Sequence, residues 1–244
     1  MDRGKVYIRP MVVSDVEQIK KLHDACLPLS YDESYYEGMA QDPDNHFCTV
    51  AALKSTRTES DETHGDESTA RLASEEIIGA VTAQYWDNES ARNANGVAGE
   101  TYAKKQDTGG LIIRGGSLLL YVSSLVVAPQ HRRKGIASHL LERCVEDALR
   151  RYVTFHESVC APAAACFVFH HPLRLHYFRP QCAAIVLHVV ARNKSAISLY
   201  RSQRFVRMKR LRRFYKYDGQ HRDAYLFVRC LNSGFVRRRR CAIM

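Results

Sequence analysis

Apolar and polar residues alternate along this chain with two different periods, which predicts strands and amphipathic helices in turn. Short apolar or alternating runs, typical of strands, occupy residues 6–9, 46–53, 77–85, 117–127, 183–190, 205–211 and 224–231. Apolar residues at helical spacing predict helices after Ser14-Asp15 and over residues 32–39, 136–152 and 193–203. This order predicts an α/β (α+β) fold with a mixed central β-sheet of about seven strands, flanked by about four helices.

Three polar or irregular stretches interrupt this pattern. Residues 54–76 and 87–116 are rich in Ser, Thr, Asn, Asp, Glu and Gly, which is typical of loops. Residues 156–182 mix Ala, Cys, Phe, His and Pro without a regular period, and we interpret them as an insertion. We therefore expect one domain over residues 1–231 and a basic C-terminal tail over residues 232–244.

The composition agrees with a single soluble domain that carries extra loops. The chain has 244 residues, of which 45% are apolar, and no apolar run approaches the roughly 20 residues of a transmembrane helix. The N-terminal segment has no apolar signal core, so we do not expect secretion. The eight cysteines form no C-x-x-C pair, which argues against a zinc ribbon or a disulfide framework.

The net charge of +10 is concentrated in the C-terminal part of the chain. From Arg201 onward there are 14 Lys/Arg and 2 Asp/Glu, a net charge of +12, which leaves −2 for residues 1–200. A near-neutral body with one basic region differs from a uniformly basic nucleic-acid-binding protein. The pattern favours a local basic surface for an anionic membrane or an acidic partner, and we expect no nucleic-acid partner.

The most informative stretch runs from Ser117 to Ser138, where an apolar strand passes through a basic loop into a helix. The first N–H groups of a helix lack intrahelical partners and its dipole attracts anions, so this arrangement suits a pyrophosphate. The spacing Arg132-x-x-Gly135-x-Ala137 resembles the acetyl-CoA signature of the GNAT acetyltransferases, Q/R-x-x-G-x-G/A, which implies a GNAT fold and acetyl-CoA as cosubstrate. The loop residues assigned to the cofactor are Arg132, Arg133, Lys134, Gly135, Ile136, Ala137 and Ser138. A simple strand–helix turn with a basic surface is the alternative.

Two polar residues in the expected central strands are candidates for proton transfer. Acetyl transfer to an amine needs a base that removes a proton from the amine and an acid that protonates the leaving thiolate. His188 can titrate near neutral pH and Tyr121 carries a hydroxyl donor, and each interrupts an apolar run. A pair of hydrogen-bonded core residues without a catalytic role is the alternative.

The surroundings of both residues resemble the NatE and NatF families of N-terminal acetyltransferases. Residues 121–126, YVSSLV, resemble the family motif Y-I-L/M-S/T-L-G, and residues 185–189, IVLHV, resemble I/V-Y-L-H-V. Residues 193–200, NKSAISLY, resemble N-x-S/T/E-A-I-x-F/L-Y. The resemblance implies that Tyr121 and His188 are catalytic. The residues it implies along the CoA arm are Leu125, Val126, Val127, Asn193 and Tyr200.

Two further segments resemble NatF more than NatE and concern the acceptor. Residues 214–219, FYKYDG, are followed by Tyr225-Leu226, and residues 27–31, LPLSY, are similar to F-P-x-x-Y. The resemblance implies an aromatic loop over a peptide N-terminus and Met-initiated, membrane-associated protein N-termini as substrates. The residues assigned to substrate binding are Leu27, Pro28, Tyr31, Ser123, Phe214 and Tyr215.

The chain departs from the family pattern at four places. Val126 and Ala137 replace glycines, Leu27 replaces the pocket Phe, and Arg212-Arg213 replaces Pro-Tyr. We expect the first two changes to preserve the fold. We hypothesise that Arg212-Arg213 favours acidic residues downstream of the acetylated terminus, the alternative being a solvated loop tip.

The C-terminal residues carry a separate signal. Four arginines, Arg237–Arg240, precede Cys241-Ala242-Ile243-Met244, which fits a C-a-a-X box whose terminal Met favours a farnesyl group. A prenyl chain beside a basic cluster gives two membrane signals. We therefore expect lipidation of Cys241 and a location on the cytoplasmic face of an intracellular membrane, the Golgi or another endomembrane, or otherwise in the cytoplasm.

No metal is expected, although several potential ligands occur together in the chain. His170, His171 and His176, with Cys166 and Cys182 nearby, match no common zinc spacing. Two alternatives to N-terminal acetylation stay open. One is a lysine or small-amine acetyltransferase on the same fold, and the other is a catalytically inactive, prenylated adaptor.

Overall fold

The computed structural model describes residues 5–54, 75–86, 112–113, 117–157, 181–231 and 236–237. Its helices are α1 (Val16–Cys26), α2 (Glu33–Gln41), α4 (Ile136–Glu157) and α5 (Lys194–Ser202). Its strands are β1 (Val6–Pro10), β2 (His46–Lys54), β3 (Glu75–Trp86), β4 (Ile112–Ile113), β5 (Ser117–Val127), β6 (Gln181–Val190), β7 (Val206–Tyr217), β8 (Gln220–Cys230) and β9 (Val236–Arg237).

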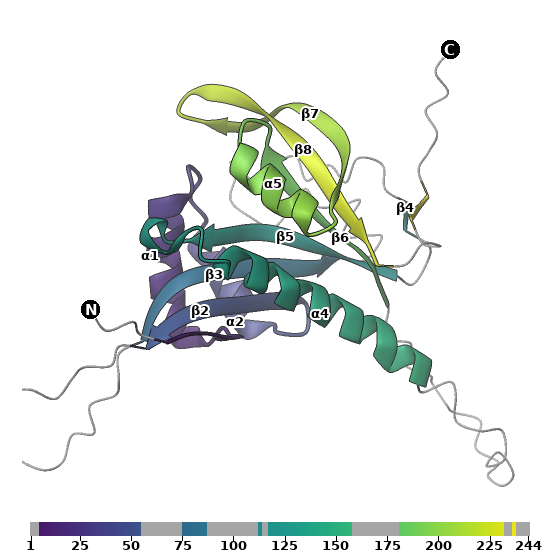
Figure 1. Cartoon of the computed structure of the whole chain (residues 1–244), viewed down its shortest axis with the longest axis horizontal. Coiled ribbons are helices and arrows are strands. Elements are labelled where there is room, and N and C mark those ends of the chain that lie inside the picture. Colours follow the sequence, from purple (N-terminus) through teal and green to yellow (C-terminus); the bar gives the residue numbers. More distant parts are fainter. Residues whose placement is uncertain are drawn as a thin grey trace, which may run out of the picture.

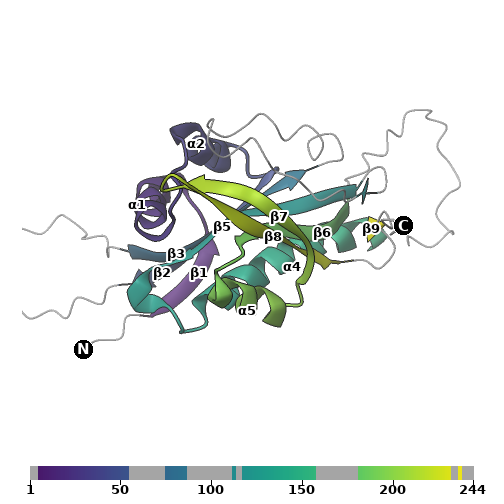
Figure 2. The ribbon, with the colours of Figure 1, turned by 90° about the horizontal axis from the view of Figure 1, so that it is seen from above.

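Seven strands form one mixed sheet in the order β1-β2-β3-β5-β6-β8-β7, which confirms the predicted sheet (Figure 1). Neighbouring strands are antiparallel except β5 and β6, which run parallel at the centre. Helices α1 and α2 cover one face, while α4 and α5 cover the other (Figure 2). Strands β4 and β9 pair with each other outside this sheet.

Each face of the sheet is closed by the apolar side of its helices. Helix α4 buries Leu140, Leu141 and Cys144 against β5 and β6, and α1 buries Ile19 and Leu22 against β2 and β3. This is the packing expected of amphipathic helices. Among the described helices, none has the unbroken apolar length that a bilayer crossing demands.

The segment over residues 156–182 that we interpret as an insertion overlaps the end of α4 and the start of β6. Helix α4 continues to Glu157, beyond the predicted end at 152, and β6 begins at Gln181. The sequence favours an earlier helix end because Val153 and Thr154 are β-branched and have low helix propensity. Residues 158–180, like most of the two polar stretches, lie outside the described residues.

Strands β5 and β6 part before either strand ends. Their pairing stops at Val122 opposite Leu187, whereas β5 stays paired with β3 up to Val127. Over residues 123–127, the edge of β5 that faces β6 is therefore not paired with that strand. Unpaired backbone groups at the centre of a sheet are available to a ligand.

A β-bulge in β5 coincides with this parting. Thr82 of β3 lies opposite Ser124, and the next residue of β3 lies opposite Val122, so Ser123 is an extra residue in β5. Because a bulge adds a residue, the alternation of side chains changes phase across it. Tyr121 before the bulge and Ser124 after it consequently face the same side of the sheet, the one covered by α1 and α2.

The hairpin of β7 and β8 is longer than predicted. The sequence predicts strands over 205–211 and 224–231 with an aromatic loop between them, but β7 continues to Tyr217 and β8 starts at Gln220. Asp218 and Gly219 form the turn with φ of 52° and 67°, the left-handed geometry of a tight hairpin. The loop prediction was wrong because the basic sequence 206–217 lacks the regular alternation that marks a strand.

Candidate active site

The structure brings Tyr121 and His188 together. The Tyr121 hydroxyl lies 3.2 Å from His188 Nδ1, and the tautomer of the imidazole decides which of the two donates. Tyr121 is 4% exposed and His188 is half-buried. His188 follows Leu187, the last residue of β6 that pairs with β5, so the two side chains lie at the place where the strands part.

Aromatic rings hold both members of this pair. Trp86, at the end of β3, stacks on Tyr121 with ring centroids 4.3 Å apart, and Phe214 of β7 stacks on His188 at 4.4 Å. Such stacking limits rotation of the two side chains, so the Tyr121 hydroxyl stays directed at the His188 imidazole. Trp86 was not among the site residues predicted from the sequence, although it is the one tryptophan of the chain and ends an apolar strand.

The connection between α1 and α2, residues 27–32, contacts both β5 and the β7–β8 hairpin. Tyr31 donates its hydroxyl to the Ser123 carbonyl at 3.1 Å and stacks on Tyr35 at 4.3 Å. Leu29 packs against the cluster of β7 and β8 that includes Phe214. The connection therefore touches β5 on one side and the β7–β8 hairpin on the other.

The residues predicted to bind the substrate differ in their burial and in their contacts. Phe214 and Tyr215 of β7 meet edge to face with ring centroids 4.9 Å apart, and Tyr215 is buried. Leu27 is half-buried beside α1, whereas Pro28 is exposed. Their contacts with a peptide stay predictions.

A bulge in β7 aims Phe214 at His188. Leu211 pairs with Ala224 and Tyr215 with Arg222, so β7 has two more residues than β8 in this interval. Arg213 takes a left-handed φ of 53°, and its N–H donates to Asp223 Oδ1 at 2.9 Å. That hydrogen bond and the Arg210 guanidinium hold the pKa of the Asp223 carboxyl below its usual range.

The predicted cofactor loop has the geometry of an anion cradle. Arg133 and Gly135 have φ of 64° and 82°, and the first helical hydrogen bond runs from the His139 N–H to the Gly135 carbonyl at 3.1 Å. The N–H groups of residues 135–138 thus lie in the first turn of α4, where helix geometry offers no partner. Arg132, Arg133 and Lys134 are exposed beside them.

A glycine in β3 allows this helix end to approach the sheet. A Cβ atom at Gly79 would lie 3.2 Å from the Val126 carbonyl and 3.3 Å from side-chain carbons of Ile136 and Leu140. These distances are too short for an ordinary contact. The absence of a side chain at Gly79 therefore allows the first turns of α4 to lie this close to β3. The residue was not singled out from the sequence, where a lone glycine in a strand gives little signal.

The other cofactor residues have structural contacts of their own. The carbonyl of Val127 accepts from Arg132 Nε at 2.9 Å, and Asn193 Oδ1 accepts from the Ala196 N–H at 3.1 Å and caps α5. Tyr200 is buried against Phe205. Leu125 and Val126 occupy the part of β5 that is not paired with β6.

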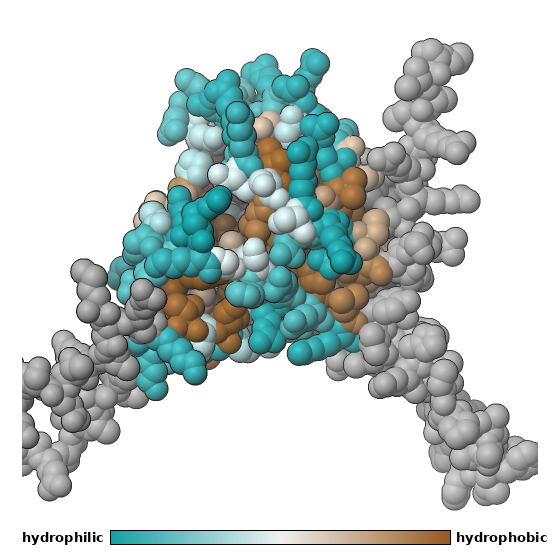
Figure 3. Space-filling view, viewed as in Figure 1, coloured by the Kyte–Doolittle hydropathy of each residue, from teal (hydrophilic) through white to brown (hydrophobic). Residues whose placement is uncertain are grey.

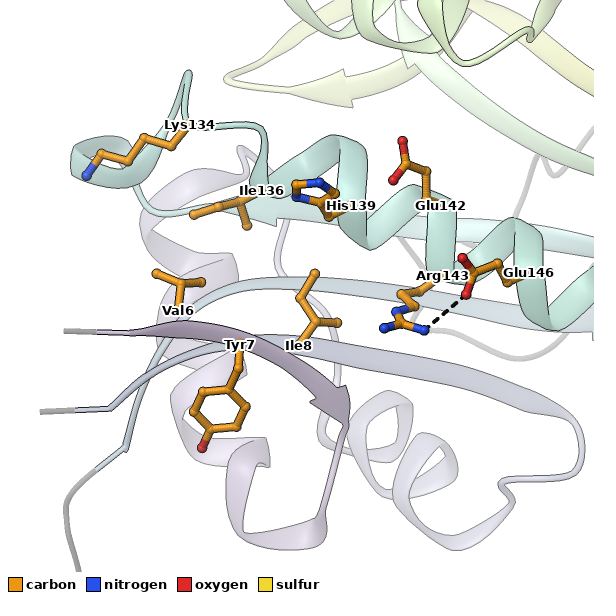
Figure 4. A pocket seen from close by; sticks show the side chains of 9 residues that line it. All are labelled: Val6, Tyr7, Ile8, Lys134, Ile136, His139, Glu142, Arg143 and Glu146. Carbon is orange, nitrogen blue, oxygen red and sulfur yellow. Dashed lines mark hydrogen bonds and ion pairs between the residues drawn. The ribbon is translucent and has the colours of Figure 1, made fainter. Parts of the chain in front are cut away.

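A hollow on the far side of the cofactor loop is separate from this pair. It measures about 550 Å³ and lies between β1 and α4. Figure 4 shows Ile8 and His139 on its two walls and Lys134 at its end. Neither Tyr121 nor His188 lines it, so we do not assign the reaction to it.

Two groups of predicted residues fall outside the structural description. Cys166, His170, His171 and His176 are among them, and so is Cys241. Within the residues that are described, no group of three or more His, Cys, Asp or Glu side chains could hold a metal ion. Cys182 is buried in β6, with Sγ 3.5 Å from the Ala184 carbonyl.

The chain resembles known proteins in both sequence and fold. The sequence pattern of the Acetyltransferase (GNAT) family matches residues 16–167. Histone acetyltransferase MCC1 of Arabidopsis thaliana is 24% identical over 232 residues, covering 93% of this chain and 71% of that protein. N-alpha-acetyltransferase 60 of Drosophila melanogaster is 25% identical over 246 residues, covering 94% and 70%. The crystal structure of Arabidopsis thaliana NAA60 in complex with acetyl-CoA superposes with a TM-score of 0.60 and 24% identity, covering 93% of this chain and 99% of that one.

Proposed function

Because this chain belongs to the GNAT family of acetyltransferases, we propose that it transfers the acetyl group of acetyl-CoA to the free α-amine of protein N-termini. The observation that carries the proposal is the Tyr121–His188 pair, held 3.2 Å apart where β5 and β6 separate. The similarity to proteins named N-alpha-acetyltransferase 60 supports it.

The residues around the gap fit acetyl-CoA. The first-turn N–H groups of α4 and the cations of residues 132–134 suit its pyrophosphate, and residues 125–127 of β5 offer backbone groups to its pantetheine arm. When bound, acetyl-CoA supplies the thioester carbon that the amine attacks. Gly79 lets the first turn of α4 lie close to the sheet, and Gly135 supplies the left-handed φ of 82° that leads into that turn.

The chain's own residues handle the protons. His188, directly or through water, accepts a proton from the incoming ammonium group and so leaves a neutral, nucleophilic amine. As the new C–N bond forms and the C–S bond breaks, Tyr121 donates its proton to the departing sulfur, and the second proton lost by the nitrogen restores the tyrosine hydroxyl. Tyr31, Ser123 and Phe214 border the side from which the amine enters.

We propose that residues on the side from which the amine enters set the finer substrate preference. Leu27 and Tyr31 are apolar enough for a Met side chain, and the resemblance to NatF favours Met-initiated termini. We propose that Arg212 and Arg213 add a preference for acidic residues a few positions downstream. Both are exposed beside Phe214, and β7 carries six Lys/Arg and no Asp/Glu. Figure 3 shows the hydrophilic surface at the β7–β8 end of the molecule.

Membrane attachment is a further part of the proposal and rests on the sequence. Prenylation of Cys241, next to Arg237–Arg240, would hold the enzyme at the cytoplasmic face of an endomembrane. There the active site would meet the N-termini of membrane-associated substrates. The six cations of β7 add positive charge to the same half of the chain.

Acetylation of a peptide library by the purified protein tests the proposed activity. Mass spectrometry should find the acetyl group on α-amines, with Met-initiated peptides preferred. The similarity to the protein named Histone acetyltransferase MCC1 makes ε-amines the second candidate. Acetylation confined to lysines would replace the proposal by that candidate, and absence of any turnover would favour the inactive adaptor.

A further inference from the structure

A histidine that takes no part in the proposed reaction is sealed beneath the site. His23, in the last turn of α1, is 0% exposed. Its Nδ1 lies 3.0 Å from the Tyr36 hydroxyl and its Nε2 lies 3.0 Å from Ser124 Oγ. Burial lowers the pKa of His23 to about 4, so the ring is neutral at neutral pH, with one nitrogen donating and the other accepting.

From Nε2 of His23, a series of contacts between hydroxyl groups extends toward Tyr121. Ser124 Oγ lies 2.7 Å from Thr82 Oγ1. Thr82 Oγ1 in turn lies 2.7 Å from the Tyr35 hydroxyl and 2.9 Å from Ser123 Oγ. The chain of contacts therefore ends on the extra residue of the β5 bulge, two positions from Tyr121.

The same residues contact Tyr31, which we propose borders the acceptor. Tyr31 donates to the Ser123 carbonyl, stacks on Tyr35, and has its ring centroid 5.2 Å from that of His23. The bulge makes this possible because it places the side chains of Ser123 and Ser124 on one face, both within reach of Thr82. A regular strand would send one of them to the opposite face.

We propose that His23 is a positioning residue for the acceptor. Through Ser124 and Thr82, its Nε2 edge fixes Ser123 and Tyr35, and these fix Tyr31 against the incoming N-terminus. This inference rests on the proposed function. Loss of the Nε2 partner would remove one of the two hydrogen bonds of the buried Ser124 hydroxyl, and a buried group that loses a partner shifts to recruit a new one. Tyr31 would then move, while the cofactor loop, on the other side of β5, would not.

The two ring nitrogens can be tested separately. In His23→Asn the amide overlaps the Nδ1 position and keeps the Tyr36 contact, whereas in His23→Gln it reaches the Nε2 position and keeps the Ser124 contact. We expect the peptide KM to rise about five- to tenfold in His23→Asn, from the loss of one buried hydrogen bond. It should change less than about twofold in His23→Gln. The acetyl-CoA KM should be unchanged in both, although both should melt at lower temperature.

A second pair of variants covers the case in which His23 substitutions fail to fold. Ser124→Ala removes the Nε2 partner and should raise the peptide KM, while Tyr36→Phe removes the Nδ1 partner and should lower only the melting temperature. Equal peptide KM values within each pair, or a parallel rise in the acetyl-CoA KM, would overturn the positioning role. Failure of the wild-type protein to acetylate any peptide would instead overturn the proposed function.

Discussion

The Tyr121 hydroxyl lies 3.2 Å from Nδ1 of His188, although the two residues are 67 positions apart. They come from the two parallel strands at the centre of the sheet, and His188 lies just beyond the last residue of β6 that pairs with β5. Stacking on Trp86 and Phe214 keeps them aligned. An acid and a base placed side by side at the point where the sheet opens are what acetyl transfer to an amine requires.

Replacing either member of this pair should slow the chemical step. We expect kcat to fall by roughly 10² or more in His188→Ala and by a smaller factor in Tyr121→Phe, which keeps the ring against Trp86, since positioned acid–base groups contribute about 10²–10⁴. Steady-state acetylation of a Met-initiated peptide measures this. Leu53→Ala, in β2 and packed against the core on the α4 side of the sheet, serves as a control for loss of stability. Full activity in both active-site variants would remove their proposed roles.

The cofactor loop should respond to a side chain at Gly135. Its φ of 82° costs a β-branched residue about 1–2 kcal/mol, so Gly135→Val should distort the cradle and raise the acetyl-CoA KM by about tenfold. Gly38→Ala in α2 is the matched control, because a Cβ there meets nothing within 4 Å. An unchanged acetyl-CoA KM in Gly135→Val would show that the loop does not hold the cofactor.

Charge at the β7 bulge should set downstream selectivity. Peptides with Asp or Glu at positions two to four should have kcat/KM about three- to tenfold above their Ser analogues, since exposed ion pairs each contribute less than about 1 kcal/mol. In Arg212→Ser/Arg213→Asn the ratio should approach one, because Asn tolerates the left-handed φ and keeps the bulge. Lys21→Gln, which removes one exposed charge from α1, should leave it unchanged. No advantage for acidic peptides in the wild type would end this hypothesis.

The buried imidazole of His23 should make the fold sensitive to acid. Burial lowers its pKa to about 4, from about 6.5 in an unfolded chain. Between these values the unfolded state binds more protons, so the free energy of unfolding rises with pH across this window and is lost as pH falls through it. Denaturant unfolding at pH 4.5 and 7 should show a loss on the order of 2 kcal/mol larger in the wild type than in His23→Gln. Other titrating groups are common to both proteins and cancel. Equal losses would mean that His23 titrates normally.

Lipidation of Cys241 should decide where the protein resides in cells. Fractionation should recover the wild-type chain with endomembranes and the Cys241→Ser variant largely in the soluble fraction, because a basic cluster alone binds weakly. Replacing Cys230, which is exposed at the end of β8, controls for the loss of a thiol. Equal membrane recovery of Cys241→Ser and wild type would contradict prenylation.

The elements with strong patterns were predictable, and those set by tertiary pairing were not. The apolar strand over residues 117–127 is confirmed to the residue. Its bulge could not be seen, because a strand that is apolar on both faces shows no change of phase when one residue is added. Likewise, β7 continues beyond Leu211 because residues 215–217 pair with β8 and because Asp223 accepts a hydrogen bond from the Arg213 N–H within the bulge, neither of which the local sequence reveals.

The residues of the candidate site and those beneath it divide in the same way. Tyr121 and His188 were identified because polar side chains interrupt apolar strands at positions that resemble a known family. His23 and Thr82 gave no such signal, since a single histidine or threonine in a helix or strand is common in surfaces and cores alike. The role that we propose for them rests on contacts between α1, β3 and β5.

The extra residue of the β5 bulge, Ser123, ties the stability of this protein to its proposed activity. Without the extra residue, β5 would keep one register with β3 along its whole length, and Ser123 and Ser124 would face opposite sides of the sheet. One of the two serines would then lose its contact with Thr82. For the proposed acetyl transfer, we therefore expect a deletion that makes this strand more regular, and so more resistant to heat, to lower the activity.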